Sequence, residues 1–327
     1  MSVLSILRLL LAAALGCAVL PVAIADTPAL TPVVIATGSS VPATVLFVAD
    51  EMGYFAQEGL AVKFDHCIGA SRCIDNVFEG KAQFAAVGDL ALMFNSIEHQ
   101  DFTVLATYAT STSMLKLITR KSAHISKAQD LIGKRVGMPK KSAPHYFLDN
   151  FLLFEGVDPK LVEHVFVDLD GMSAALASGK VDALSTFEPL ASRQRAALGK
   201  DAFDLTVPPY NLSTHLVASR KTVAQSHADT VKVLKAMDKA VQYIAREPLK
   251  AKAILAKHSG LDAAGLDSLW TGSQFKLVLD PSLQVTLNSA ARWAKNENLI
   301  NEGQFPDFSE FINAEPLTAA RSKGTAK

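Results

Sequence analysis

The sequence predicts an α/β protein of two lobes, joined by a two-strand hinge, with a ligand cleft between the lobes. Three observations indicate this fold. Short apolar runs alternate with helical patterns from residue 32 onward, which is the βαβ order of parallel sheets. That order breaks near residue 114, resumes, and ends near residue 219. The chain has 327 residues, 49% of them apolar, which is enough for two compact cores.

The first 25 residues predict a cleaved secretory signal peptide. One positive charge at Arg8 precedes an uncharged apolar run, and residues 23–25 have the small-x-small form of a signal-peptidase site. The alternative is a degenerate lipobox at Cys17, whose acylation would tether the mature chain to a membrane. We therefore expect a periplasmic protein, with the lipid anchor as the less favoured alternative.

The charge balance excludes some partners. The chain carries 32 Lys and Arg against 32 Asp and Glu, so its formal net charge is +0. Nucleic-acid and anionic-membrane binding usually need a basic surface, and we expect neither.

Two cysteines follow the signal segment, Cys67 and Cys73, six positions apart. Export places them where a disulfide persists, so we expect a bridge between a strand and the next helix. The alternatives are two free core thiols, or a metal site with His66. That site lacks a third and fourth ligand at suitable spacing. We expect no metal and no cofactor.

The first series of elements follows the βαβ order. A hydroxyl-rich loop follows the first strand, and Gly59 ends the first helix, whose apolar face runs from Val45 to Phe55. We expect strands over residues 32–36, 61–65, 83–87 and 102–109, and helices over residues 45–59, 70–80 and 90–98.

The second series begins with a strand over residues 114–119 and a capping box opened by Ser126. A strand over residues 134–138 leads to a helix with Ser142 at its N-cap, an apolar face of Phe147, Phe151 and Phe154, and a stop at Gly156. We expect further strands over residues 164–168 and 181–187, and helices over residues 172–178 and from residue 189.

A strand over residues 212–219 is expected to return the chain to the first lobe. Beyond it the pattern is predominantly helical, with helices over residues 229–246, 249–257, 262–270 and 281–298 and no further βαβ unit. The predicted lobes are residues 31–113 with 220–312, and residues 114–219. Residues 319–327 are expected to form a flexible tail.

Ligands in open α/β sheets lie beyond the carboxyl ends of the strands. The helix start at Ser142 would add backbone N–H donors and the positive end of a helix dipole. Strand ends alone place these residues at the cleft: Ser39, Ser40, Gly88, Asp89, Thr110, Ser111, Ser142, Phe187 and Glu188.

Four segments in register resemble a known family: ATGSSVPATVLFVADEMGYFAQEGLAVKF, VFEGKAQFAAVGD, DLIGKRVGMPKKSAPHYFLDNFLLFEGVDP and ALASGKVDALSTFEP. The chain resembles periplasmic solute-binding proteins of ABC importers, in the NMT1/THI5-like and SsuA-like group that serves nitrate, sulfonate, taurine and thiamine-pyrimidine uptake. The resemblance implies a type II periplasmic binding protein fold and a monomer, not an enzyme, that delivers a small ligand to a membrane permease. It implies ligand contacts at Ser39, Ser40, Asp89, Thr110, Ser111, Ser142 and His145.

The ligand class stays open. Lys140 and Lys141 stand where many members have a glycine, and they favour an anion. Asp89 and Glu188 favour a cation or an amine, so a zwitterion or an aminopyrimidine would suit all four. Phe187 replaces a tryptophan that sulfonate binders often carry.

Structural alternatives also stay open. Asp89 and Glu188 could be helix caps, the lysines a solvated face and His145 a surface histidine. The rival functions are a thiamine-precursor enzyme, whose cysteine-rich cluster this chain lacks, and the ligand-binding component of a sensor.

Overall fold

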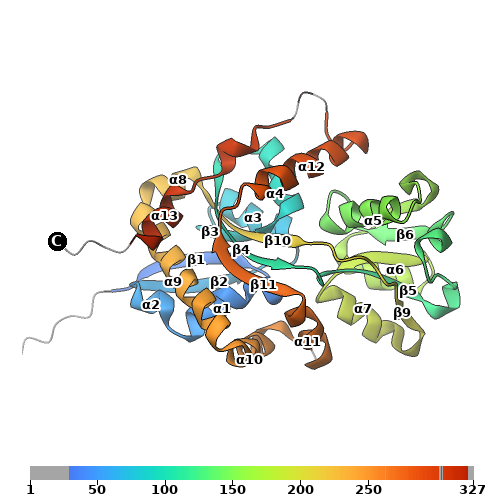
Figure 1. The fold of residues 1–327 in the computed structure, drawn as a ribbon, viewed down its shortest axis with the longest axis horizontal. Coiled ribbons are helices and arrows are strands. Elements are labelled where there is room, and N and C mark those ends of the chain that lie inside the picture. The colour runs from blue at the N-terminus through green and yellow to red at the C-terminus, as the bar shows by residue number, and fades with distance from the viewer. Residues whose placement is uncertain (1–28, 262, 302, 304, 323–327) are drawn as a thin grey trace, which may run out of the picture.

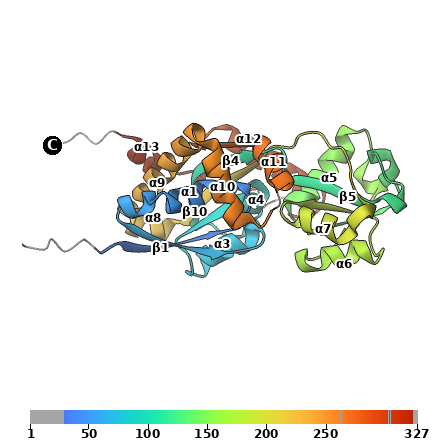
Figure 2. The ribbon, with the colours of Figure 1, turned by 90° about the horizontal axis from the view of Figure 1, so that it is seen from below.

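The computed structural model describes residues 29–261, 263–301, 303 and 305–322. Two β-sheets lie toward opposite ends of an elongated molecule, each covered by helices on both faces (Figures 1 and 2). This arrangement confirms the predicted two-lobe α/β fold. The predicted signal peptide and Cys17 lie outside the described residues. Within the described part of the chain, no helix is both long enough and apolar enough to span a membrane.

The first lobe contains a six-stranded sheet in the order β11-β4-β10-β3-β1-β2. Strand β1 pairs in parallel with β2 and β3, whereas β10 runs antiparallel to β3 and β4. A strand that returns from the other lobe enters at the carboxyl edge of the parallel strands, so it must run against them. The strands are β1 (Thr31–Thr37), β2 (Leu60–His66), β3 (Phe84–Gly88), β4 (Phe102–Ser111), β10 (Leu212–Ser219) and β11 (Ser273–Val278).

Two apolar clusters flank this sheet. One packs β1, β4 and β10 against α1 (Thr44–Glu51), α9 (His227–Arg246) and α10 (Pro248–Ser259). The other packs the opposite face against α3 (Ala70–Phe78), α4 (Asp89–Glu98) and α12 (Ser282–Asn296). The remaining elements of this lobe are η1 (Val41–Ala43), α2 (Tyr54–Gln57), α8 (Arg220–Gln225), α11 (Ala263–Thr271), η7 (Phe308–Phe311) and α13 (Glu315–Arg321).

The second lobe contains a five-stranded sheet in the order β7-β6-β8-β5-β9. Its strands are β5 (Leu115–Arg120), β6 (Arg135–Met138), β7 (Glu163–Phe166), β8 (Ala183–Phe187) and β9 (Ala202–Asp204). Helix α5 (Ala143–Phe154) covers one face, and α6 (Met172–Ala177) and α7 (Leu190–Leu198) cover the other. The short helices are η2 (Lys121–Ala123), η3 (Ala128–Leu131), η4 (Pro159–Leu161), η5 (Leu169–Gly171) and η6 (Gly199–Asp201).

The predicted lobe boundaries need correction. The predicted returning strand over residues 212–219 is confirmed as β10, but it lies between β3 and β4 in the first sheet, so these residues belong to the first lobe and not to the second. The chain therefore crosses between the lobes at residues 112–114 and 205–211. The first lobe also extends past residue 312, because α13 packs against α9 and includes residues 319–321 of the predicted tail.

Several local predictions also need correction. The first predicted helix is broken at Gly53, whose φ of 68° suits glycine, into α1 and α2. Phe147 and Phe151 of α5 are buried, but Phe154 is 74% exposed. The predicted capping box at Ser126 is one-sided, because the Asp130 carboxylate accepts from the backbone N–H groups of Ser126 and Lys127 and from the Ser126 hydroxyl. Strands β9 and β11 and helix α13 were not predicted.

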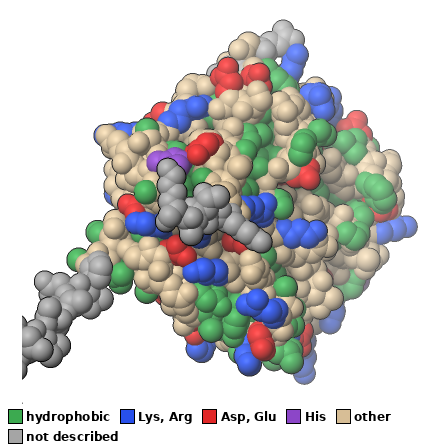
Figure 3. All heavy atoms as spheres, turned by 60° about the vertical axis from the view of Figure 1, so that its left-hand side comes forward, with side chains coloured by type: hydrophobic (Ala, Val, Ile, Leu, Met, Phe, Trp, Pro, Cys, Tyr) green, Lys and Arg blue, Asp and Glu red, His purple; other side chains and the backbone are tan. Residues whose placement is uncertain are grey.

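The surface agrees with the balanced composition. On the face shown in Figure 3, acidic and basic side chains are interspersed, and no field of one sign gathers over it.

Candidate ligand cleft

One edge of the first sheet gathers most of the predicted ligand contacts. Strands β1, β3 and β4 end at this edge, and the antiparallel strands β10 and β11 begin there. The topology therefore places Ser39 and Ser40, Asp89, Thr110 and Ser111 along one row, together with Ser213 at the start of β10. On the facing lobe, Ser142 and Phe187 follow β6 and β8.

Asp89 holds the centre of this row. Its side chain is only 1% exposed. Its Oδ1 accepts from His215 Nε2 at 2.8 Å and its Oδ2 accepts from the Ser213 backbone N–H at 2.9 Å. Thr107 Oγ1 lies 2.9 Å from His215 Nδ1 and completes a buried chain of three side chains. Asp89 is the first residue of α4, and Gly88 takes the N-cap position, so the cap alternative for Asp89 is wrong.

The row also carries hydroxyl groups. Ser40 takes the N-cap position of η1, but its side chain makes no capping hydrogen bond. Ser111 Oγ lies 3.2 Å from Ser113 Oγ and accepts from Ser273 Oγ at 3.0 Å. A cavity of about 320 Å³ opens beside them at the hinge and is lined by Thr110, Thr112, Asn211, Thr271, Gly272 and Gln274.

On the second lobe, Ser142 caps α5 as predicted. Its hydroxyl donates to the Pro139 carbonyl at 2.6 Å and accepts from the His145 backbone N–H at 3.4 Å. The N-terminus of α5, which is the positive end of its helix dipole, therefore lies at the end of β6.

Glu188 was predicted at the cleft, but its carboxylate is satisfied within the second lobe. It accepts from the backbone N–H and the hydroxyl of Ser192, at 3.0 and 2.8 Å, and it pairs with Arg195. Glu188 is also almost fully buried. Phe187 beside it is half-buried and packs against the core of the lobe. The ion pair leaves Glu188 no free charge for a ligand.

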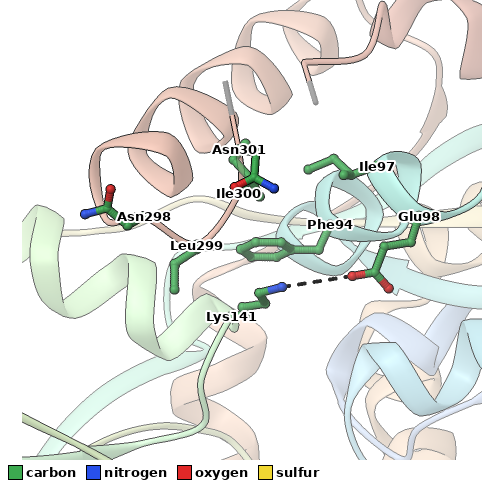
Figure 4. A pocket seen from close by; sticks show the side chains of 8 residues that line it. All are labelled: Phe94, Ile97, Glu98, Lys141, Asn298, Leu299, Ile300 and Asn301. Carbon is green, nitrogen blue, oxygen red and sulfur yellow. Dashed lines mark ion pairs between the residues drawn. The ribbon is translucent and has the colours of Figure 1, made fainter. Parts of the chain in front are cut away.

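The two lysines lie at the rim between the lobes. Lys141 Nζ is 4.0 Å from Glu98 and 5.4 Å from the Phe94 ring centroid, both on α4 of the first lobe. Figure 4 shows these groups around a cavity of about 220 Å³, which residues 298–301 close on the far side. Lys140 Nζ lies 5.3 Å from the centroid of Phe166. Both ammonium groups therefore have partners other than a ligand.

Two tyrosines near Asp89 were not predicted. The rings of Tyr146 and Tyr210 meet edge to face at 6.0 Å. Burial raises the pKa of both, and the charge of Asp89 raises them further, so both hydroxyls stay protonated as donors. Tyr146 lies one turn after Ser142, which is a detectable sequence signal. Tyr210 lies in the second crossing segment, where no periodic pattern marks it.

The lobes touch on both sides of the cleft. On one side, Trp293 Nε1 of α12 donates to Asp149 Oδ2 of α5 at 2.7 Å. On the other, the loop after β2 approaches the second lobe, since a Cβ at Gly69 would lie 3.2 Å from Leu169 Cδ1. Cys67 and Cys73 join this loop in a disulfide, with their Cα atoms 5.4 Å apart. Their thiols are thereby unavailable for the metal alternative with His66.

His145 lies in the first of these contacts and not in the polar row. It is 2% exposed, and its ring centroid is 5.0 Å from that of Trp293 and 5.2 Å from that of Phe166. Burial lowers its pKa to about 4, so the imidazole is neutral at pH 7. The surface alternative for His145 is wrong.

Two α/β lobes that face each other across strand ends, joined by two crossing segments, define the periplasmic-binding-protein class of fold. A solved structure with this fold is the alkanesulfonate-binding protein SsuA from Xanthomonas axonopodis pv. citri bound to MOPS. It is 15% identical, with a TM-score of 0.73 over 87% of this chain and 98% of that one. The fold alone does not define the activity, because the desulfurization enzyme DszB also has it, at 15% identity and a TM-score of 0.63 over 89% of this chain and 98% of that one.

The sequence relationships are narrower. The model of the NMT1/THI5-like family matches residues 42–251, and the chain belongs to this family. A relative is the taurine-binding periplasmic protein of Escherichia coli strain K12. It is 28% identical over 255 residues, which cover 73% of this chain and 77% of the relative.

Proposed function

We propose that this chain is an extracytoplasmic solute-binding protein that captures a small aminoalkanesulfonate, of the taurine type, and delivers it to the permease of an ABC importer. The observation that carries the proposal is the polar row at the edge of the first sheet, which combines many neutral donors with one buried carboxylate, Asp89. The family and the taurine-binding relative support the same class of ligand.

The donors suit a sulfonate. Its three oxygens accept hydrogen bonds without needing a neighbouring cation, and hydroxyls, backbone N–H groups and helix starts supply donors. Serines at the strand ends, the N-terminus of α5 and the protonated hydroxyls of Tyr146 and Tyr210 are such donors. Because Lys140, Lys141 and Glu188 have other partners, they drop out of the proposed ligand set.

Asp89 suits an amine. Among the described residues, the carboxylate accepts two hydrogen bonds, from His215 and Ser213, and an ionised carboxylate has about four acceptor positions. An ammonium group would add a charge-assisted hydrogen bond to a carboxylate that the sheet already holds in place. A zwitterion with both groups therefore fits better than a simple anion.

Binding without chemistry is the activity that we infer. The hydrogen-bonded side chains of Asp89, His215 and Thr107 are the residue types of a catalytic triad. The acid, however, is the member nearest the cleft, and the hydroxyl is the farthest from it. Asp89 lies at the sheet edge, whereas Thr107 is buried four residues back along β4. A nucleophile in that position would not reach a ligand at the edge, so we assign His215 and Thr107 to positioning Asp89.

Closure of the lobes would report binding. Residues 112–114 and 205–211 are the only crossings in the described part of the chain, and they can act as a hinge. A ligand that contacts both sheet edges stabilises the closed form in proportion to its extra affinity for that form. We expect the bound protein to be more compact in X-ray scattering.

Calorimetric titration of the purified protein tests the proposal with three matched ligands. Taurine has both groups, ethanesulfonate lacks the amine, and β-alanine has a carboxylate in place of the sulfonate. We expect taurine to bind most tightly, and Asp89→Asn to reduce taurine binding about tenfold or more while changing ethanesulfonate little. Asp101→Asn, on an exposed turn, is the control. Equal affinities for all three ligands, or no binding by any, would contradict the assignment.

A further inference from the structure

A group of three side chains on the second lobe lies outside the polar row. His145 and Asp149 are one turn apart on α5, so they share a face of the helix, and His164 lies beside them on the edge strand β7. One donor atom from each lies within 4.8 Å of the other two. Two imidazoles and a carboxylate are the donor set that zinc takes at sites with an open fourth position.

The hydrogen bonds of His164 leave a place for a cation. Its Nδ1 is 3.0 Å from the Val162 carbonyl, which can only accept, so Nδ1 carries a hydrogen. Its Nε2 is 2.7 Å from Asp149 Oδ1. A neutral ring would then set a lone pair against a carboxylate oxygen, which is repulsive. At this distance a proton lies between the two atoms, and a metal ion would replace it only if the atoms moved apart. An N–H donated to a backbone carbonyl is the usual support of a metal-binding histidine.

His145 supplies a buried imidazole to the group. Its ring is buried, its Nδ1 has no hydrogen-bond partner among the described residues, and its Nε2 stands 3.9 Å from Asp149 Oδ2. A buried ring nitrogen without a partner is costly, and such groups in folded proteins call for an explanation. The nitrogen that faces the carboxylate, and that would bind an ion, is Nε2, so the metal site rests on the position of Nε2 and not on the unpaired Nδ1.

Neighbouring residues fix the carboxylate of Asp149 in place and add negative charge, which favours a divalent cation. Trp293 Nε1 donates to Asp149 Oδ2 at 2.7 Å and fixes the orientation of that group from the other lobe. Glu297, just after the end of α12, lies within electrostatic range of Asp149 and His164. Two carboxylates, Asp149 and Glu297, therefore act on the imidazole of His164. Lys140 and Lys160 are the cations that act on this region, on His145 and Glu297 respectively.

We infer that His145, Asp149 and His164 form a binding site for a divalent transition metal of the zinc type, placed on the contact between the two lobes. Ligand atoms on a tetrahedral zinc ion lie roughly 3.3 Å apart, because each bond is about 2.0–2.1 Å long. The three donors, which lie within 4.8 Å of one another, therefore have to move closer together to bind one ion. Because Asp149 is both a ligand and the acceptor of the bond from Trp293, metal binding would stiffen this side of the cleft.

Metal titration tests the site without any organic ligand, so its outcome is independent of the sulfonate proposal. The chelator-treated, full-length mature protein is titrated with Zn²⁺ alone by calorimetry, and bound zinc is counted by mass spectrometry after dialysis. We expect one zinc per chain, and at least tenfold weaker binding in His145→Gln and in His164→Gln. Co²⁺ in place of zinc should give the visible absorption of a low-coordinate site, and each variant should lose it.

Controls separate ligation from folding and from chance surface binding. His258→Gln removes a histidine that pairs with Glu51 at 3.1 Å outside this group, and should leave the stoichiometry and the cobalt spectrum unchanged. Circular dichroism shows whether each variant is folded, and Asp149→Asn provides a further variant if one imidazole substitution fails. No stoichiometric zinc in the wild-type protein, or a cobalt spectrum that survives both His145→Gln and His164→Gln, would overturn the inference and leave a proton between His164 and Asp149.

Discussion

Trp293 donates its indole N–H to Asp149 Oδ2 across the boundary between the lobes, at 2.7 Å, and both residues are buried. The same carboxylate meets His164 through its other oxygen. A single buried aspartate therefore receives one bond from each lobe, and this side of the cleft cannot open without exposing it.

Trp293→Phe removes the donor and part of the ring volume, and keeps an aromatic ring in the contact. We expect unfolding free energy to fall by about 1–3 kcal/mol, because a buried acceptor loses its partner. We also expect the ligand-free protein to expand in X-ray scattering. Trp270→Phe is the matched control, since Trp270 packs against Phe275 within the first lobe. Equal compactness of the Trp293→Phe and wild-type proteins would show that the bond does not hold the lobes together.

Arg135 and Asp182 give the second lobe a pH-dependent contribution to stability. Arg135 donates to both carboxylate oxygens, at 2.8 to 3.1 Å, and these hydrogen bonds lower the pKa of Asp182. A lowered folded-state pKa means that the contribution is present above the unfolded-state pKa, near 4, and is lost as pH falls through the folded-state value.

Asp182→Asn should therefore destabilise the protein at pH 7, and the difference from wild type should shrink below about pH 4. Urea unfolding at pH 7, 4 and 3 measures it. A difference that stays constant over this range would mean that shape, and not charge, explains the effect of the substitution.

The disulfide Cys67–Cys73 should stabilise the loop that meets Leu169 at the cleft. It joins residues six apart, and closing such a short loop contributes about 2 kcal/mol in the chain-entropy model. We expect the double variant Cys67→Ser, Cys73→Ser to melt at a lower temperature, and a thiol reductant to lower the melting temperature of the wild type only. A reductant effect on the variant would point to a cause other than this bridge.

The sequence predicts those parts of the fold that are set by local patterns. The parallel strands, the cap at Ser142 and the row of strand ends follow from periodicity and from the rule for parallel sheets. Strand β11 was missed because it lies at the sheet edge between two helices, and its pairing with β4 joins segments over 160 residues apart. Nothing local marks that pairing.

The site is less predictable, because ion pairs with other side chains decide which charged groups remain available to a ligand. Glu188 and Asp89 both follow strands and look equivalent in the sequence, yet Arg195 neutralises Glu188 inside its own lobe. Asp89 instead meets His215 from a strand 126 residues away. His145 has the spacing of a ligand contact, but it is enclosed by His164 from the next strand and by Trp293 from a distant part of the chain.

Tyr210 offers a sharp test of where the ligand binds, because it lies on the second crossing segment and near Asp89. If its hydroxyl donates to the bound sulfonate, Tyr210→Phe should weaken taurine binding about tenfold, the value of one hydrogen bond to a charged group, because the packing of the ring on Tyr146 and Phe147 is kept. Tyr243→Phe is the control, since Tyr243 packs against Tyr54 within the first lobe. Calorimetric titration with taurine compares the two variants. Unchanged affinity in Tyr210→Phe would place the sulfonate elsewhere along the row, toward the serines that follow β1 and β4, whereas an equal loss in both variants would indicate an indirect effect on the fold.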